Sequence, residues 1–89
     1  MLEQDTTIKN RLGLHARAAS KLVETCQRFG SAIEVIRDGQ AANGKSIMSM
    51  LMLQATLGTP VTIRVEGEDE AEALQAVLSL IDDFFGEGG

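Results

Sequence analysis

The segment from Val61 to Glu66 constrains the fold most, because its residues alternate between apolar and polar. A period of two is typical of a β-strand that buries one face and exposes the other to water. The alternation runs through Val61, Thr62, Ile63, Arg64, Val65 and Glu66. A strand of this kind belongs to a sheet with one buried face, so other segments of the chain must pack on that face.

Two segments repeat their apolar residues at helical spacing instead. The first begins at Ala16 and runs for about 12 residues, with Gly30 as a stop signal. The second follows the acids of residues 68–72, which suit the positive N-terminal end of a helix. The predicted buried positions are Ala19, Leu22, Val23, Cys26 and Phe29 in the first helix, and Ala71, Leu74, Val77, Leu78, Ile81 and Phe84 or Phe85 in the last.

Three shorter strands and a short helix complete the predicted elements. Asp38-Gly39 is a dipeptide that a type I′ turn favours, so it joins two strands in a hairpin. Ser46 is a good N-cap for a short helix. The strands are expected at residues 2–8, 31–37 and 40–43, and the short helix at residues 46–53.

The element order is therefore strand, helix, strand, strand, helix, strand, helix. We expect an α+β open-faced sandwich, in which a four-stranded antiparallel sheet carries three helices on one face. The 89 residues are 44% hydrophobic and 24% charged, as in ordinary globular proteins. A chain this short has room for one core, so residues 1–89 are predicted to form a single domain.

Charge and composition exclude several kinds of function. Residues 66–89 carry eight acids and no base, whereas residues 9–45 carry seven bases and three acids, so an anionic ligand or acidic partner is expected at the latter segment. Nucleic acid is not expected as a partner, because three Phe are the only aromatic residues and the net charge is −5.

One Cys and one His argue against a metal site, and no cofactor is expected. The absence of a long apolar segment or signal-like N-terminus predicts a cytoplasmic protein without membrane insertion.

The single histidine, His15, stands where the first helix begins. Histidine is a poor N-cap, so a role other than helix stability is indicated. The free amides of a helix N-terminus bind phosphate, and we expect an anion site at Ala16 and Arg17, with the Arg17 guanidinium contacting the same anion. Positive surroundings favour neutral imidazole, which can act as a nucleophile for a phosphoryl group. The alternative is that His15 is an ordinary surface residue.

The segment from Gly44 to Leu53 is apolar nearly all round its predicted helix. A short helix on a sheet buries only part of such a surface, and exposed Met-rich surface suits the docking of several partners. The expected docking residues are Ile47, Met48 and Leu51, whereas Met50 and Leu53 are expected in the core. The alternative is that all of them belong to the core and that Ser46 is only an N-cap.

Two segments resemble the histidine-containing phosphocarrier proteins (HPr) of the bacterial phosphotransferase system. Residues 9–30, which include Gly-Leu-His-Ala-Arg, resemble the active-site segment of that family, and Gly-Lys-Ser-Ile-Met at residues 44–48 resembles its regulatory-serine segment. Residues 65–70 resemble its entry into the last helix. The resemblance covers essentially the whole chain.

The resemblance implies a four-stranded antiparallel sheet with three helices on one face. It implies that His15 accepts a phosphoryl group from enzyme I, not on its tele nitrogen Nε2, and passes it to an enzyme IIA component. The chain would then be a phosphoryl carrier and not an enzyme. Arg17 would assist the transfer, and Ile47, Met48 and Leu51 would contact the partner proteins. Ser46 matches the serine phosphorylated by HPr kinase in lineages that have it. We expect a monomer.

The sequence departs from the family at Ala18, where proline is frequent. Because alanine is a strong helix former, the departure affects the helix little. Several sequence segments resemble either a proteobacterial HPr or the nitrogen-related branch called NPr. Whether the chain serves sugar uptake or the nitrogen-related pathway therefore stays open. Two alternatives to phosphate carriage remain: a regulatory binding module switched by phosphorylation of Ser46, and a small anion-binding hydrolase such as an acylphosphatase.

Overall fold

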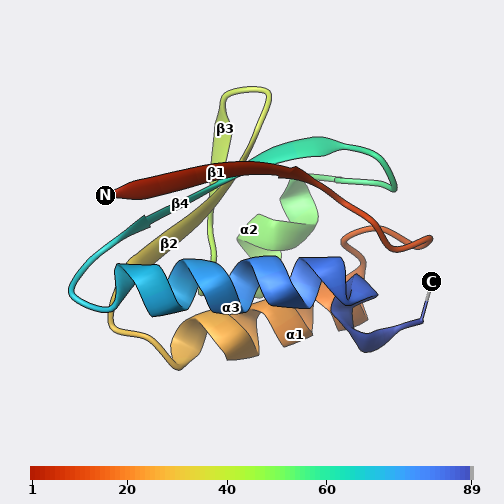
Figure 1. Cartoon of the computed structure of the whole chain (residues 1–89). Helices are drawn as coiled ribbons and strands as arrows, with labels where there is room; N and C mark the ends of the chain where they lie inside the picture. The colour runs from red at the N-terminus through yellow and green to blue at the C-terminus, as the bar shows by residue number, and fades with distance from the viewer. Residues whose placement is uncertain (89) are drawn as a thin grey trace.

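The computed structural model describes residues 1–88 and arranges them in two layers (Figure 1). An antiparallel sheet with strand order β1-β4-β2-β3 forms one layer, and three helices cover one of its faces. The strands are β1 (Leu2–Thr7), β2 (Ala32–Arg37), β3 (Gln40–Asn43) and β4 (Pro60–Glu66). The helices are α1 (Ala16–Gln27), α2 (Ile47–Met52) and α3 (Glu70–Asp82), followed by the 3-10 turn η1 (Phe84–Gly86). The predicted open-faced sandwich is confirmed.

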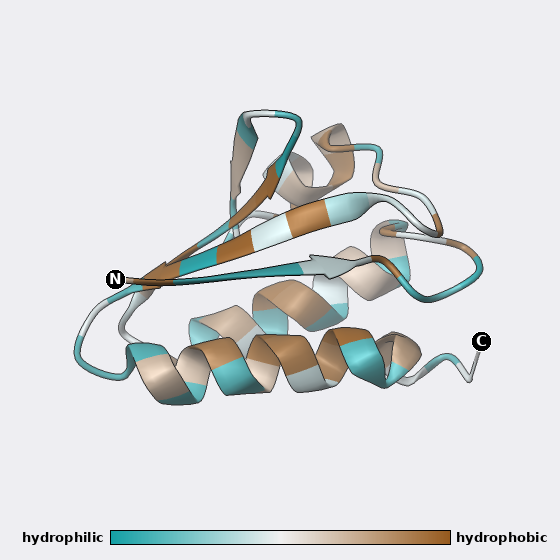
Figure 2. Ribbon diagram, turned by 45° about the horizontal axis from the view of Figure 1, so that its top comes forward, coloured by the Kyte–Doolittle hydropathy of each residue, from teal (hydrophilic) through white to brown (hydrophobic). Residues whose placement is uncertain are grey.

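Strand β4 lies in the middle of the sheet and pairs with both β1 and β2. Its side chains at Val61, Ile63 and Val65 are buried under the helices, as their alternation predicts. The alternate positions face the uncovered side, and Figure 2 shows the resulting bands of hydrophobic and hydrophilic residues along this strand. The β2–β3 hairpin turns at Asp38 (φ 48°) and Gly39 (φ 80°), the two positive values that a type I′ turn requires.

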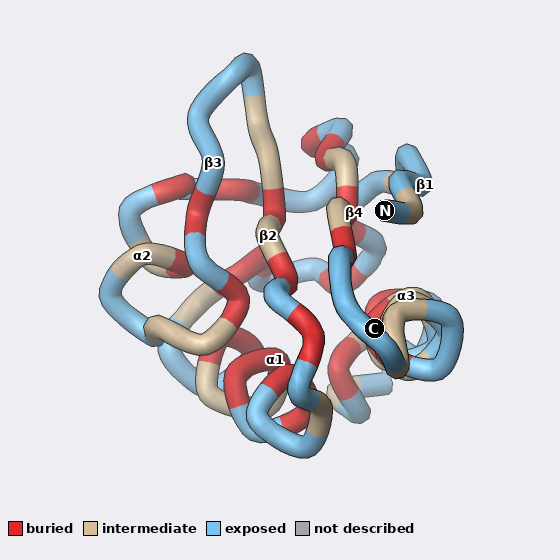
Figure 3. Tube along the Cα trace, turned by 90° about the vertical axis from the view of Figure 1, so that its left-hand side faces the viewer, coloured by how far each residue is buried: buried red, intermediate tan, exposed pale blue. Residues whose placement is uncertain are grey.

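Helices α1 and α3 bury the faces that turn toward the sheet (Figure 3). In α1 the predicted residues Ala19, Leu22, Val23 and Cys26 are all buried. The prediction of Phe29 is wrong, because α1 ends at Gln27 and Phe29 in the following turn is only partly buried. In α3 the prediction of Ala71 is wrong. The buried row of α3 is instead Ala73, Val77 and Ile81, and Phe85 of η1 continues the same spacing of four residues.

Ala71 is exposed because it lies outside this row, whereas Leu74 and Leu78 border the row and are partly buried. Residues four apart lie on one face of a helix, one turn above another. Of the two candidate phenylalanines, Phe85 is fully buried and Phe84 only partly. Among the described residues no helix is long and apolar enough to cross a lipid bilayer.

Candidate functional site

The loop before α1 holds the start of that helix against the loop before β4. Leu14 N–H donates to the Ala55 carbonyl at 2.8 Å, and Ile8 N–H donates to the Thr59 carbonyl at 3.0 Å. Between them Gly13 adopts a positive φ of 70°, and a Cβ there would lie 2.6 Å from the Ala55 oxygen. This close approach requires glycine. The start of α1 is thereby held against the body of the protein.

His15 is the N-cap of α1, as the sequence predicts. Its backbone is extended, with φ −82° and ψ −178°, and its carbonyl accepts from Ala19 N–H at 2.8 Å. The imidazole makes no capping bond to the helix. Among residues 1–88 the amides of Ala16 and Arg17 have no hydrogen-bond acceptor, so they remain free to bind an anion.

The imidazole of His15 instead contacts Glu87, near the other end of the chain. Its Nε2 atom is hydrogen-bonded to Glu87 Oε2, and the side chains of His15 and Glu87 are 29% and 9% exposed. Glu87 Oε1 also accepts from Asn10 Nδ2 at 2.9 Å. The hydrogen bond from Asn10 holds the pKa of Glu87 below its usual range. The hydrogen bond with His15 and the nearby charge of Arg17 lower this pKa further. Nδ1 is therefore the ring nitrogen left without a hydrogen-bond partner in the described part of the chain.

Sequence reasoning missed Glu87 and Asn10. It assigned the acids of residues 68–72 to the positive end of the last helix and gave Glu87 no role. Glu87 lies 72 positions after His15, and no pattern in the sequence marks the pairing. The contact depends on how the chain turns after α3.

Arg17 lies beside the same carboxylate. A shallow cavity of about 270 Å³ is lined by Arg11, Leu12, Arg17, Lys21, Gly86 and Glu87. Arg17 is exposed, and its side chain forms no hydrogen bond or ion pair with any described residue, so its guanidinium is available to an incoming anion. The structure thus brings Arg17 and His15 to one end of α1, around a single acidic side chain.

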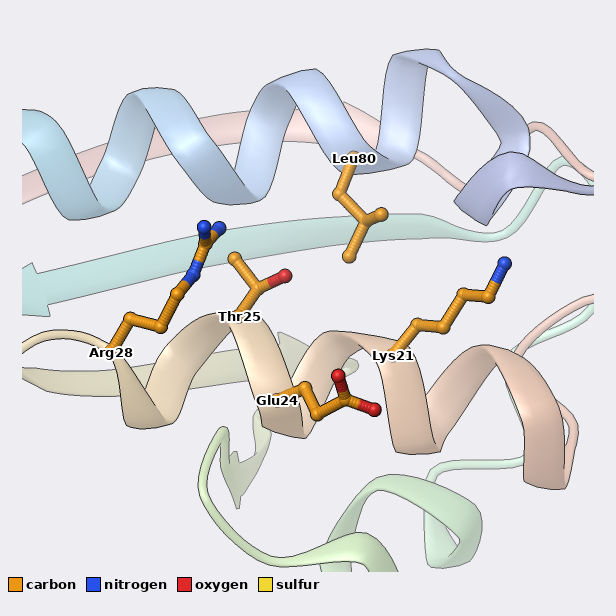
Figure 4. Close-up of a pocket in the computed structure, with 5 residues that line it drawn as sticks. All are labelled: Lys21, Glu24, Thr25, Arg28 and Leu80. Carbon is orange, nitrogen blue, oxygen red and sulfur yellow. The ribbon is translucent and has the colours of Figure 1, made fainter.

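The positive charge continues along α1 away from His15. A larger cavity, of about 450 Å³, lies between α1 and α3 and is lined by Lys21, Glu24, Thr25, Arg28 and Leu80. Figure 4 shows Lys21, Thr25 and Arg28 projecting from α1 toward α3, while Leu80 projects from α3 toward them. Lys21 borders both cavities. This basic surface is suited to an acidic protein partner rather than to a small apolar ligand.

Helix α2 divides its apolar residues between the core and the surface. Met50 is fully buried and Leu53 nearly so, at 2% exposure, as expected. Met48 is 69% and Ile47 41% exposed, whereas Leu51 is half-buried against the core. The alternative, that all these residues belong to the core, is therefore wrong for Ile47 and Met48.

Ser46 is the N-cap of α2, and its Oγ accepts from Ser49 N–H at 3.2 Å. Its side chain is half-buried. Sequence reasoning did not include Met52, which is 66% exposed and enlarges the apolar surface of this helix.

Comparison with known proteins decides the family. The family model described as "PTS HPr component phosphorylation site" matches residues 2–83. The chain belongs to the HPr family. It is 49% identical to the phosphocarrier protein HPr of Cupriavidus necator, over 99% of each chain. It is also 38% identical to the phosphocarrier protein NPr of Shewanella violacea, over 97% of this chain and 94% of that one.

HPr structures confirm the fold. The crystal structure of HPr from Thermoanaerobacter tengcongensis superimposes with a TM-score of 0.94 at 44% identity, over 98% of each chain. A crystal structure of the HPr dimer from the same organism gives a TM-score of 0.79, over 98% of this chain and 100% of that one. Both HPr and NPr proteins are therefore among the relatives, and the chain is a phosphocarrier protein of the phosphotransferase system.

Proposed function

We propose that His15 accepts a phosphoryl group on Nδ1 from phosphorylated enzyme I and passes it to an enzyme IIA component. One observation carries the proposal. Among residues 1–88, Nδ1 is the imidazole nitrogen without a hydrogen-bond partner, and it lies at the N-terminus of a 12-residue helix whose first amides also have no acceptor there. Chemically, such an end of a helix suits a group that carries negative charge.

The transfer requires no proton donor from this chain. The Nδ1 lone pair forms a bond to phosphorus while the bond from phosphorus to the donor atom of enzyme I breaks, and the phosphoryl group arrives with its oxygens ionised. The amides of Ala16 and Arg17, with the Arg17 guanidinium, neutralise those oxygens. The second transfer reverses these steps. The chain is thus a carrier without turnover of its own, and this step requires no metal or cofactor from the chain.

A two-step transfer experiment tests this function. The chain is phosphorylated with enzyme I and labelled phosphoenolpyruvate, separated from enzyme I, and mixed with IIA-type proteins of the host. We expect label to leave the chain and appear on an IIA protein. Label that never leaves the carrier for any IIA protein would contradict the donor half of the proposal.

We further propose that Ile47, Met48 and Leu51 contact the partners, next to the basic surface of α1. Met48→Glu is expected to raise the KM for phosphorylation by enzyme I at least tenfold, because a charge would be placed in an apolar contact and opposite an acidic partner. The free energy of unfolding should change by less than about 0.5 kcal/mol, as is usual at exposed positions.

Ala71→Glu is the matched control for Met48→Glu. It adds the same charge at an exposed position of α3, a helix that covers a different part of the sheet (Figure 1). The KM of this control should stay within about twofold of the wild-type value, as expected for a surface change away from the contact. Equal increases in both variants would show a general effect of net charge, and an unfolding penalty in Met48→Glu would return Met48 to the core.

Regulation through Ser46 is the second function that we propose. Ser46 caps the N-terminus of the helix that exposes Ile47 and Met48. A phosphate on its hydroxyl would place a charge of about −1.5 to −2 beside the docking residues. Ser46→Asp should raise the KM for enzyme I several-fold while His15 still accepts phosphate. An unchanged KM, measured with steady-state phosphorylation assays, would remove Ser46 from partner recognition.

The setting that we propose is cytoplasmic, where phosphoenolpyruvate and its enzymes are found. We expect the protein to be a monomer, because a carrier presents one surface to successive partners. An HPr-kinase-type enzyme is a partner only in hosts that possess one. A protein that acts chiefly as a regulatory module would dock on partners and accept phosphate on Ser46, but would transfer poorly through His15.

A further inference from the structure

The chain makes an unusual turn after α3, and this turn brings Glu87 to His15. Phe84 and Phe85 both have positive φ values, 56° and 52°. Two consecutive residues in the left-handed region are costly unless they are glycine. The fold fixes them through the fully buried Phe85 ring and through two bonds, Gly86 N–H to the Asp83 carbonyl and Glu87 N–H to the Phe84 carbonyl, both 2.9 Å long.

The carboxylate that this turn delivers is held at both oxygens. Oε2 is bonded to His15 Nε2, and Oε1 accepts from Asn10 Nδ2. Asn10 is itself fully buried, and its Nδ2 also donates to the Gly13 carbonyl at 2.7 Å. Asn10 thus joins the loop before α1 to the C-terminal turn, and the orientation of the carboxylate is set before any partner binds.

This arrangement determines where the imidazole proton lies. Neutral histidine has one ring N–H, and a carboxylate can only accept, so the proton is on Nε2 when Glu87 is ionised. The lone pair of Nδ1 is then exposed for attack. When a phosphoryl group bonds to Nδ1, the ring keeps its Nε2 proton and gains a positive charge, which the Glu87 carboxylate faces directly.

We propose that Glu87 is a positioning residue for His15: with Asn10 it fixes the Nε2–H tautomer and stabilises the cationic ring of the phosphorylated carrier. The inference rests on the proposed function and adds a residue from the other end of the chain. Arg17 and Lys21 line the same cavity, and their charges favour the phosphoryl group rather than the ring cation. Glu87 is the acidic side chain in contact with the ring.

The test compares Glu87→Ala with Asp83→Ala. Asp83 lies four residues earlier, is exposed, and its side chain forms no hydrogen bond or ion pair with any described residue. Both variants lose one carboxylate, but only one loses the contact with His15. At pH 8.5, proton NMR with 15N labelling should show the ring Nε2–H signal in the wild type and in Asp83→Ala, and should lose it to exchange with water in Glu87→Ala.

The second measurement is the equilibrium between phosphorylated enzyme I and the phosphorylated carrier. Loss of a charge-assisted hydrogen bond to the cationic ring should shift it toward enzyme I roughly tenfold in Glu87→Ala and less than twofold in Asp83→Ala. A retained Nε2–H signal in Glu87→Ala, or an unchanged equilibrium, would overturn the proposal. If the wild type accepted no phosphoryl group, the proposed function would fail, while the NMR signal, recorded without phosphate, would still decide whether Glu87 fixes the tautomer.

Discussion

The variant His15→Ala is expected to accept no phosphoryl group from enzyme I, a loss limited only by the detection threshold of the assay. His15 is the only histidine of the chain, so no second imidazole can replace it. Alanine is a poor N-cap, and the imidazole makes no capping bond that would be lost. The thermal midpoint should therefore fall by only a few degrees, within the effect of about 1 kcal/mol on a domain of this size.

The same variant should still bind enzyme I. Because the proposed docking residues on α2 are unchanged, excess His15→Ala should slow phosphorylation of the wild type as a competitor. Arg17→Ala provides a contrast, since it keeps the nucleophile and should slow acceptance without abolishing it. Phosphorylation of folded His15→Ala at the wild-type rate would refute the role of His15.

The variant Phe85→Ala is expected to cost about 3–5 kcal/mol of unfolding free energy, the usual loss for a fully buried phenylalanine. That is a large part of the roughly 4–13 kcal/mol that a chain of this length has in total. The same ring fixes the turn that brings Glu87 to His15, so truncation should also loosen that contact. Urea unfolding followed by circular dichroism measures the loss.

Phe84→Ala is the matched control for Phe85→Ala. Its ring is only partly buried, although its backbone is also left-handed. Its expected cost is below about 1.5 kcal/mol, because less apolar area returns to water. If the two variants lost equal stability, the stability would depend on the left-handed backbone rather than on the buried Phe85 ring.

Local patterns were sufficient to predict the elements of this fold. The alternation in β4, the Asp38-Gly39 turn and the serine cap of α2 each depend on residues close in sequence, and each is present in the structure. The buried row of α3 was placed partly wrong. Several faces of this helix carry apolar residues, so the spacing alone does not decide between Ala71 and Ala73, and packing on the sheet decides it.

The residues of the candidate site also divide into those that the sequence predicts and those that only the structure shows. His15, Ala16 and Arg17 are neighbours in sequence, and their position at a helix start was predictable. Glu87 was not, because its position depends on two left-handed phenylalanines and on a buried Asn10, which no periodicity encodes. Acidic residues in a charged tail are normally solvated, and only the three-dimensional contact distinguishes this one from its neighbours.

The most direct test of phosphate carriage is the chemical stability of the bound phosphate. The chain is incubated with enzyme I and labelled phosphoenolpyruvate, and the labelled protein is then exposed to acid or to alkali. Phosphohistidine predicts label that is lost in acid, survives alkali and is absent from His15→Ala. Acid-stable label, or no label on a folded chain with a competent enzyme I, would contradict phosphate carriage by His15.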